Sequence, residues 1–548
     1  MTGTLALAAS IAAMDQQALT RLVASRRVIS PAVVHEPLGL AIELLRADSI
    51  SRALQSAHRE DLDALRALTG GDDADPAILA SLAGLGLIGT DADGSPHPLL
   101  EVTEALPAQA TAAQPAMSDA GITPEDFTGW FAAALTSVRR TAKLLHTIAA
   151  HPVRLGRKGR PAVVAVRELA EAAHCSPEQA SRLLDVMRAA GLLHAHIDQT
   201  GTEQLGIAEP ETQRWLMQYS YPERWIELAR AQAARFDARL LRGLSETGGK
   251  LREVAETLPR DYPLLPEAEI ESLVSVTAAA EDLGLTLHGH LTPVASALLG
   301  RDDATAAAIA ERDIPGNVPG VYLQPDLSII VPGPLPPEDE AVLGAIAETE
   351  QLGPAASLRV STERLTKAVL RAGSGTHEVR AALERLSLTG IPQPLDYLLR
   401  DLDRKANEYA PGFEGTSSSL DLHGWDAGAA LANRSLRPSR GASSPAGRSP
   451  GLSKSSTMHE DELQAMIERV LAASAEGSGE GDLTRRLELA IRDRSPVRVT
   501  AVAGGDEREF TLLPVSLKGG RLRATDQLAG VERTLPVSAI TAVATLAA

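Results

Sequence analysis

The side chains best suited to chemistry in this sequence are the cations of a short basic run. The run reads HPVRLGRKGR, and its charged members are Arg154, Arg157, Lys158 and Arg160. Guanidinium and ammonium groups bind phosphate oxygens, and such contacts supply most of the sequence-independent affinity of proteins for nucleic acids. The run therefore predicts a surface that contacts DNA. The alternative interpretation is a solvated basic face that binds nothing, because charged residues are mostly exposed whatever their role.

A pattern typical of a helix-turn-helix follows directly and would position these cations. In AVRELAEAAHCSPEQASRLLDVMRAAGLLHAHI, Ser176 is expected to cap a helix that starts with Pro177, since these residue types favour those two positions. Gly191 would end that helix and begin a hairpin with Gly201 at its tip, as in the wing of a winged helix. The expected elements are a strand over 163–166, a helix over 167–173, a turn over 174–176 and a helix over 177–190.

The second of these helices would be the recognition helix, which lies in the major groove in such folds. Gln179 and Arg182 are expected on its outward face and Arg188 near its end, whereas Glu178 and Asp185 argue against tight insertion into the groove. The predicted DNA-contacting residues are Arg154, Arg157, Lys158, Arg160, Gln179, Arg182 and Arg188. One helix earlier, further cations stand at Arg139, Arg140 and Lys143.

Two other stretches repeat the order of a helix, a Gly-Leu-apolar junction and a hairpin. ILASLAGLGLIGTDADGSPHPLLEV starts a strand at Leu87-Ile88 and has a turn signal at Asp93-Gly94. ESLVSVTAAAEDLGLTLHGHLTPVASALLG has Leu283-Gly284-Leu285 and a turn near Gly289. Arrays of winged-helix-like modules bind DNA or other proteins equally readily, so this architecture does not select between the two uses.

No residues with the spacing of a catalytic or metal site are found in the sequence. A nucleotide-hydrolysing motor needs a Gly-rich loop that ends in Gly-Lys-Ser/Thr, whereas Gly248-Gly249-Lys250 is followed by Leu251. Neither a Gly-x-Ser-x-Gly nor an HExxH motif is present, and the single cysteine, Cys175, is interpreted as a small buried turn residue. We therefore expect no catalytic residue, no metal and no cofactor, and a protein that is not an enzyme.

The stretch from Gly320 to Lys405 is the most informative for function. Apolar runs at 321–323 and 327–331, separated by Gln324-Pro325-Asp326, predict two strands joined by a turn. A helix with an acidic first turn follows and is expected to include Ala347-Glu348-Thr349. Further expected elements are an extended piece at 358–360 and helices that begin near Thr362, Thr376 and Pro394. The prediction is a small α+β module.

This module resembles a known domain. The order QPDLSIIVPGPL, a helix with AET, RVSTERLTKAVLRAG and ALERLSLTGIPQPLDYLL is similar to the helicase-associated domain at the N-terminus of XPB-type DNA repair helicases. It is also similar to actinobacterial helicase-associated proteins that carry this domain without a motor. The resemblance implies a non-catalytic accessory role in DNA repair or transcription, in which the chain contacts DNA or positions a separate helicase.

The C-terminal region is expected to form a helix followed by antiparallel strands in an SH3-like β-barrel. The run LELAIRD, VRVTAV, EREFTLLPVSL, GGRLRATD and VERTLPVSAITAV resembles a WYL domain, a ligand- and nucleic-acid-sensing module of bacterial regulators. The matching framework residues are Arg508, Pro514 and Arg533. The Trp-Tyr-Leu tripeptide has no counterpart, since Arg521-Leu522-Arg523 stands near its place, and Ala539 stands where the family has a later arginine.

At 548 residues, the chain is long enough for three or four domains of about 150 residues. The expected fold class is multi-domain and mainly α with small β-sheets (α+β). The expected domains are a helical, winged-helix-like domain (1–110), a winged-helix domain (121–230), a third such unit (231–315), the XPB-N-like domain (318–408), a Ser/Gly/Pro-rich disordered linker (409–457) and the WYL-like domain (458–548).

Composition narrows the function. The net charge of −18 confines any DNA contact to a local patch, and an aromatic content of 3% leaves few stacking platforms for single strands. No apolar run reaches the length of about 18 residues that a membrane span needs, so we expect a cytoplasmic protein, with nucleoid association as an alternative. The expected partners are DNA and a separate helicase or another transcription or repair protein. The alternatives are an interaction scaffold or transcriptional regulator that does not bind DNA, and a ligand-sensing regulator acting through the C-terminal domain.

Overall fold

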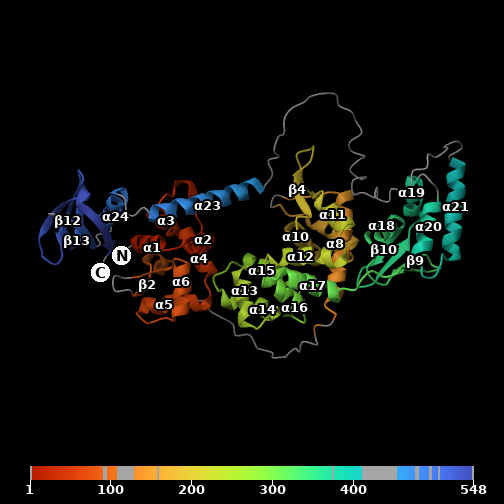
Figure 1. The fold of residues 1–548 in the computed structure, drawn as a ribbon, viewed down its shortest axis with the longest axis horizontal. Coiled ribbons are helices and arrows are strands. Elements are labelled where there is room, and N and C mark those ends of the chain that lie inside the picture. Colours follow the sequence, from red (N-terminus) through yellow and green to blue (C-terminus); the bar gives the residue numbers. More distant parts are fainter. Residues whose placement is uncertain are drawn as a thin grey trace, which may run out of the picture. The chain divides into compact units, whose positions relative to one another are not determined.

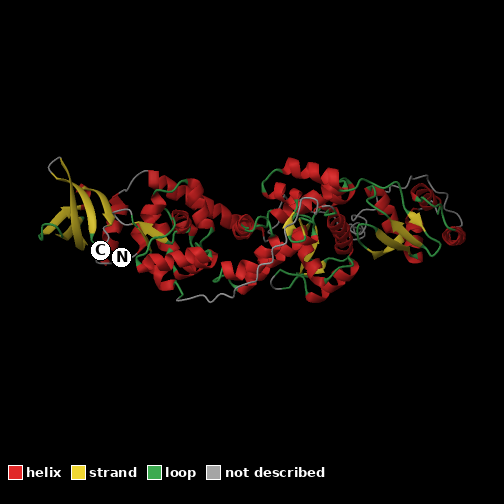
Figure 2. Cartoon of the chain, turned by 90° about the horizontal axis from the view of Figure 1, so that it is seen from below, coloured by secondary structure: helices red, strands yellow, loops and turns green. Residues whose placement is uncertain are grey.

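The computed structural model describes residues 3–90, 95–107, 127, 129–156, 159–372, 376–409, 453–475, 480–492, 496–503 and 506–545. The described chain is a mixed α+β structure in which helices predominate and the strands form small antiparallel sheets (Figure 1, Figure 2). Its residues group into two compact units, Met1–Ala116 with Thr257–Ile270 and Leu452–Ala548, and Met117–Glu256 with Glu271–Gly451. The domain boundaries expected from the sequence stay predictions.

The N-terminal part of the first unit is a helical cluster with one hairpin. Its elements are α1 (Gly3–Ala12), α2 (Gln16–Ala24), a 3-10 turn (Pro31–Val33), α3 (Pro37–Leu44), α4 (Ala47–Ser56), α5 (Arg59–Gly70), α6 (Pro76–Gly84), β1 (Ile88–Thr90), β2 (Pro96–Pro98) and α7 (Leu100–Ala105). Asp15 and Asp75 cap α2 and α6 by accepting backbone N–H groups. The predicted hairpin forms, because β1 pairs with β2, while its expected turn at Asp93-Gly94 lies outside the described residues.

A helix from far along the sequence completes this cluster. In α23 (Ser453–Ala475), the side chains of Met466, Ile467 and Val470 are buried in the same apolar core as Leu19 and Leu38. The Arg469 guanidinium donates to the carbonyl oxygens of Pro31, at 2.8 Å, and Val34, at 3.2 Å. The helix expected at the start of the C-terminal domain is therefore part of the core of the N-terminal helices.

The C-terminal strands form one open antiparallel sheet. The elements are α24 (Glu480–Arg492), β12 (Val497–Ala503), β13 (Asp506–Lys518), β14 (Arg521–Asp526), β15 (Glu532–Pro536) and β16 (Ile540–Thr545), and the strand order is β15-β14-β13-β12-β16. Leu483 and Leu487 of α24 pack against Val497 and Val499 of the sheet. The strands predicted from the sequence are confirmed. The predicted barrel is not found, since β15 and β16 are the two edges and no pairing among the described residues joins them.

The second unit begins with the predicted winged-helix-like segment. Its elements are α8 (Phe131–Ala150), β3 (Val153–Arg154), α9 (Val163–Ala172), α10 (Pro177–Ala189), β4 (Leu193–Ile197), β5 (Glu203–Ile207) and α11 (Glu211–Met217), with the sheet order β3-β5-β4. Ser176 caps α10 as expected: its hydroxyl oxygen accepts the Gln179 N–H, and its own backbone N–H donates to Gln179 Oε1. The strand predicted over 163–166 is wrong. These β-branched residues begin α9, which buries Leu169 and Ala170 and packs on α10, so tertiary packing overrides their strand propensity.

Six helices and a short hairpin follow, and all of their residues except Thr257–Ile270 group with the second unit. They are α12 (Tyr221–Ala233), α13 (Ala238–Glu246), α14 (Leu251–Asp261), α15 (Glu267–Asp282), β6 (Thr286–Leu287), β7 (His290–Leu291), α16 (Pro293–Leu299) and α17 (Asp303–Asp313). The rings of Trp130 and Trp225 stack with centroids 4.7 Å apart, and Trp225 Nε1 donates to the Leu283 carbonyl oxygen at 2.8 Å. The end of α15 is thereby fixed against α8 and α12.

The predicted α+β module lies at 320–409. It consists of β8 (Tyr322–Leu323), β9 (Ser328–Val331), α18 (Pro337–Ile346), β10 (Ala347–Gln351), β11 (Ala356–Val360), α19 (Thr362–Ala372), α20 (His377–Leu386) and α21 (Gln393–Tyr409). The sheet order is β10-β11-β9-β8, and the helices bury Leu343, Leu365, Leu383 and Leu399 in the core. One expectation is wrong, because the helix ends at Ile346 and residues 347–351 form the edge strand β10 paired with β11.

Candidate nucleic-acid interface

The basic run predicted to contact DNA forms a closed loop between β3 and α9. We call residues 154–161 the basic loop. Leu155 bridges to Pro161, and the Gly156 N–H donates to the Arg160 carbonyl oxygen at 2.8 Å, which brings the two ends of the loop together. Arg154 and Arg160 are exposed, whereas Arg157 and Lys158 lie outside the described residues. Arg154 and Arg160 therefore stand at the two ends of one closed loop, both exposed to solvent and available for phosphate contacts.

Arg188 supports this loop from α10. Its Nη2 donates to the Gly159 carbonyl oxygen at 3.1 Å. Arg188 was predicted to contact DNA near the end of the recognition helix, and the structure instead places it against the backbone of the loop. The contact that the structure shows therefore positions the basic loop.

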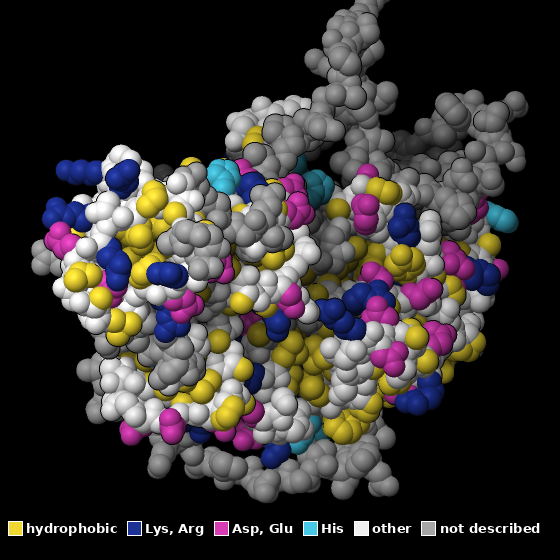
Figure 3. Space-filling model, turned by 60° about the vertical axis from the view of Figure 1, so that its left-hand side comes forward, with side chains coloured by type: hydrophobic (Ala, Val, Ile, Leu, Met, Phe, Trp, Pro, Cys, Tyr) yellow, Lys and Arg dark blue, Asp and Glu magenta, His cyan; other side chains and the backbone are white. Residues whose placement is uncertain are grey.

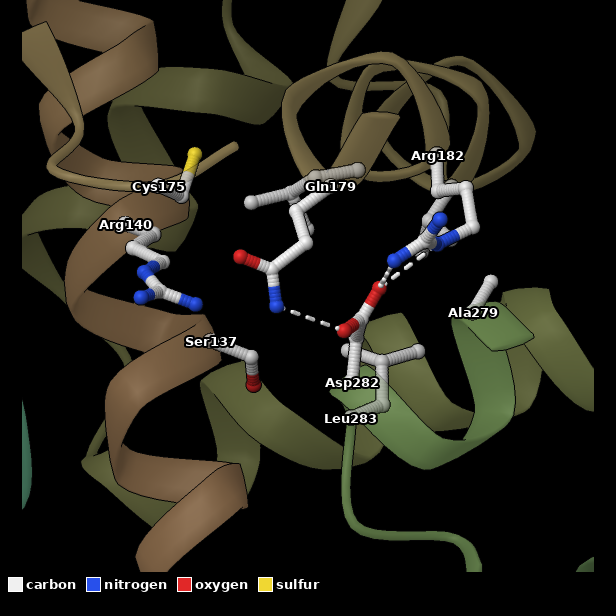
Figure 4. Close-up of a pocket in the computed structure, with 10 residues that line it drawn as sticks. Ser137, Arg140, Cys175, Gln179, Arg182, Ala279, Asp282 and Leu283 are labelled. Atoms are coloured by element: carbon white, nitrogen blue, oxygen red, sulfur yellow. Dashed lines mark hydrogen bonds and ion pairs between the residues drawn. The ribbon is translucent and has the colours of Figure 1, made fainter. Parts of the chain in front are cut away.

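The predicted outward face of α10 is turned toward α15 (Figure 4). Gln179 Nε2 donates to Asp282 Oδ1 at 2.9 Å, and Arg182 Nε donates to Asp282 Oδ2 at 2.7 Å. The exposed fractions of the Arg182 and Asp282 side chains are 19% and 24%. Because Asp282 stands at the end of a helix that is fixed in the core, these two side chains are held by the chain itself. Helical periodicity placed them on an outward face, which is wrong.

A small cavity of about 20 Å³ adjoins this contact and holds the single cysteine. Ser137, Arg140 and Cys175 line it together with Gln179 and Asp282 (Figure 4). Cys175 is a half-buried turn residue, as expected, and burial raises the pKa of its thiol. A cavity of this volume holds about one water molecule, so it is not a substrate site.

We expect Cys175 to react slowly with iodoacetamide near neutral pH. Thiolate is the reactive form, and a raised pKa lowers the thiolate fraction at any pH below it. Alkylation rates of the native chain should therefore lag those of the urea-unfolded chain and keep rising at pH values where the unfolded chain has reached its plateau. Coincident pH–rate profiles for the two states would contradict this.

The cations one helix earlier are engaged within the chain. Arg139, 7% exposed, donates to the carbonyl oxygens of Gly353 at 2.7 Å and Gly333 at 2.6 Å, and Arg140 donates to the His174 carbonyl oxygen at 3.1 Å. Burial lowers the pKa of Lys143, and the nearby Arg364 guanidinium lowers it further. Arg139 and Arg140 thus stabilise the fold through contacts with backbone carbonyl groups.

The carbonyl groups that Arg139 binds belong to the 320–409 module, so α8 and the module are in direct contact. A second contact lies beside it, where Arg224 Nη1 donates to Glu340 Oε2 at 2.8 Å and the Tyr221 hydroxyl donates to Glu340 Oε1. We call Arg139, Tyr221, Arg224 and Glu340 the polar clamp. Arg224 is 1% exposed, and its guanidinium lies 5.4 Å from the Tyr221 ring centroid.

The clamp is a buried electrostatic environment. Burial and the Glu340 carboxylate raise the pKa of Tyr221, so this hydroxyl stays protonated and keeps donating to Glu340. In such a buried, hydrogen-bonded pair, removal of one partner leaves the other charge uncompensated, so the contact is costly to break.

The residues matched to the WYL framework are only partly brought together. Arg533 Nε donates to Asp526 Oδ2 at 2.7 Å, and its guanidinium lies over the Phe510 ring, 5.0 Å from the centroid. Pro514 lies at an irregularity in the pairing of β13 with β14, and Arg508 pairs across the sheet with Ala501. Arg533 therefore has a structural role that the sequence did not reveal.

Basic and acidic side chains are interspersed on the face drawn in Figure 3. In the part of the chain that the structure describes, no group of three His, Cys, Asp or Glu side chains is arranged to hold a metal ion. No helix of that part is both long enough and apolar enough to cross a bilayer.

Residues 321–424 match the family model of the helicase conserved C-terminal domain. The match spans the module from β8 to α21 and continues into residues outside the described ranges. No curated protein matches the chain. The chain therefore carries a helicase-related domain, which the polar clamp joins to the helices that bear the basic loop.

Proposed function

We propose that this chain is a non-catalytic, helicase-associated accessory protein of DNA repair or transcription. In this proposal the basic loop contacts DNA, and the 320–409 module, which we take to be XPB-N-like, positions a partner helicase. The observation that carries the proposal is the polar clamp, because it joins the helicase-related module to the helices that bear the basic loop. The sequence also lacks the Gly-Lys-Ser/Thr loop of a motor, which supports an accessory role.

The double variant R154A/R160A tests the DNA contact. It should weaken binding of a short duplex and reduce the slope of log affinity against log salt by about 2, at about 0.9 per lost phosphate contact. Fluorescence anisotropy over a salt series measures both. The matched control is R27A/R312A, which removes two arginines with exposed side chains (67% and 71%) elsewhere. If the two double variants have the same duplex affinity and the same salt slope, the basic loop does not contact DNA.

A scaffold that does not touch DNA is the second candidate function. It is favoured by the engagement of Arg182, Arg188 and the neighbouring Arg139 within the chain, which takes these cations out of a shared phosphate-binding surface. If neither duplex nor forked nor single-stranded DNA binds at low salt, while the full chain still captures a purified helicase, this candidate replaces the first. Ligand sensing by the WYL-like sheet has no comparable observation in its favour.

A further inference from the structure

The outer face of α21 carries an aromatic side chain followed by cations at helical spacing. We call Tyr397, Arg400 and Arg404 the α21 stripe. Tyr397 is 73% exposed, and the side chains of Arg400 and Arg404 are 75% and 69% exposed. Residues three, four and seven apart lie on the same side of a helix, so these groups share one surface.

The opposite face of α21 fixes this surface to the module. Leu395, Leu399 and Leu402 are 1%, 0% and 6% exposed and belong to the core of the 320–409 module. In Figure 1, α21 lies along the outer edge of the module, next to α20. The stripe is therefore a rigid, solvent-facing feature of the helicase-related domain.

Phosphate is the ligand that the stripe's cations fit. Two carboxylates on the same helix pair with them, since Arg400 Nη2 lies 2.8 Å from Asp396 Oδ2 and Asp401 lies 2.6 Å from Arg404 and 2.8 Å from Lys405. These are pairs between residues three or four apart on an exposed helix, which are weak and screened by salt. A nucleic-acid strand can displace these carboxylates. When cations bind its phosphates, the counterions condensed on the strand are released, and this release favours binding.

The exposed ring of Tyr397 indicates that the stripe fits single-stranded nucleic acid better than a duplex. Among the exposed large apolar side chains of the described residues, only Tyr322 and Tyr397 are aromatic. An exposed ring offers a face on which an unpaired base can stack, whereas bases in a duplex already stack on one another. The distance along the helix from position 397 to 404 is about 10 Å at 1.5 Å per residue. Along that length the helix presents one ring and two guanidinium groups to a strand.

We infer that the α21 stripe binds single-stranded nucleic acid, with a base on Tyr397 and phosphates on Arg400 and Arg404. This inference rests on the proposed function, in which the chain works on DNA beside a helicase. It adds to the basic loop a second nucleic-acid surface, which prefers single strands to duplexes. The basic loop lacks an aromatic ring among its residues and serves duplex or single strand alike. A helicase produces single strands, so a single-strand site on the helicase-related domain suits that role.

The test uses the full chain and fluorescein-labelled oligonucleotides in anisotropy titrations. The probes are a dT 20-mer and a 20-base-pair duplex, and the variants are Y397A, Y397F, R400A/R404A and the charge-matched R27A/R312A. We expect Y397A to weaken dT 20-mer binding at least about fivefold, Y397F to restore it, and neither to change duplex binding. R400A/R404A should reduce the single-strand salt slope by about 1.4, at about 0.7 per contact.

Each other outcome overturns the inference. If R154A/R160A weakens binding while Y397A and R400A/R404A leave the dT 20-mer affinity unchanged, the stripe is not a strand site and the proposed function stands. If the wild-type chain binds no oligonucleotide, both the stripe and the DNA contact of the proposed function fall. If R400A/R404A abolishes capture of a helicase without changing oligonucleotide affinity, the stripe belongs to a protein partner.

Discussion

Replacing Arg224 with alanine is expected to lower the free energy of unfolding of the second unit by about 3 kcal/mol, the lower end of the cost of breaking a buried ion pair. Arg224 is 1% exposed and donates to Glu340 and, at 2.6 Å, to the Leu216 carbonyl oxygen. Its removal leaves that carbonyl without a partner and opens space beside the Trp215 and Tyr221 rings. The lower end applies because the Glu340 side chain is 30% exposed and water can solvate it.

Urea denaturation followed by tryptophan fluorescence measures this loss, since Trp130, Trp215 and Trp225 all lie in that unit. Limited proteolysis should also cut earlier between α17 and β8, because the clamp no longer holds the module. The control is Arg230→Ala on the same helix, where exposed pairs with Glu227 and Asp303 are together expected to contribute under about 1 kcal/mol. Equal losses for the two variants would show that the clamp adds nothing to stability.

Gly284→Ala should cost about 3 kcal/mol or more, because strain and overpacking add. Gly284 has φ +78°, and a Cβ placed there would lie 2.7 Å from the Trp130 carbonyl oxygen and 3.3 Å from the Ala133 Cβ. Both neighbours belong to the start of α8 and cannot move without disturbing the stack of Trp130 on Trp225.

Gly191→Ala is the matched control for this substitution. It has φ +72° at the junction between α10 and β4, with no atom within 4 Å of the added Cβ. Only the left-handed strain of about 1–2 kcal/mol is expected there. Thermal and urea unfolding of the two variants separate strain from crowding, and equal losses would refute the packing part of the argument.

The elements that the sequence predicted well depend on signals within a few residues. The Ser176-Pro177 start of α10, the hairpin turn at Gly201 and the strands β8 and β9 follow from capping, turn and alternation rules, which act locally. The edge strand β10 was missed for the opposite reason. Its residues Glu348, Thr349 and Glu350 have no apolar alternation, and they become a strand only because β11 pairs with them.

The sequence predicted which cations belong to the candidate site, but it did not predict which of them are exposed together on one surface. Exposure of Arg154 and Arg160 followed from their place in a polar loop. The engagement of Gln179 and Arg182 did not, because Asp282 lies about a hundred residues away and no local pattern pairs it with α10. Glu340 was assigned to the acidic start of a helix, where its charge suits the dipole, and only the fold reveals that it also binds Tyr221 and Arg224.

The burial of α23 among the N-terminal helices sets the order in which the protein can fold during synthesis. Leu19 and Val470 share one core, so that core stays incomplete until the ribosome has made α23. At about 5–20 residues per second, the intervening stretch takes about 20–90 s to translate. During this interval the apolar faces of α1 to α3 lack their cover, while the second unit already has all its described elements. The part made first is thus expected to mature last and to depend most on chaperones.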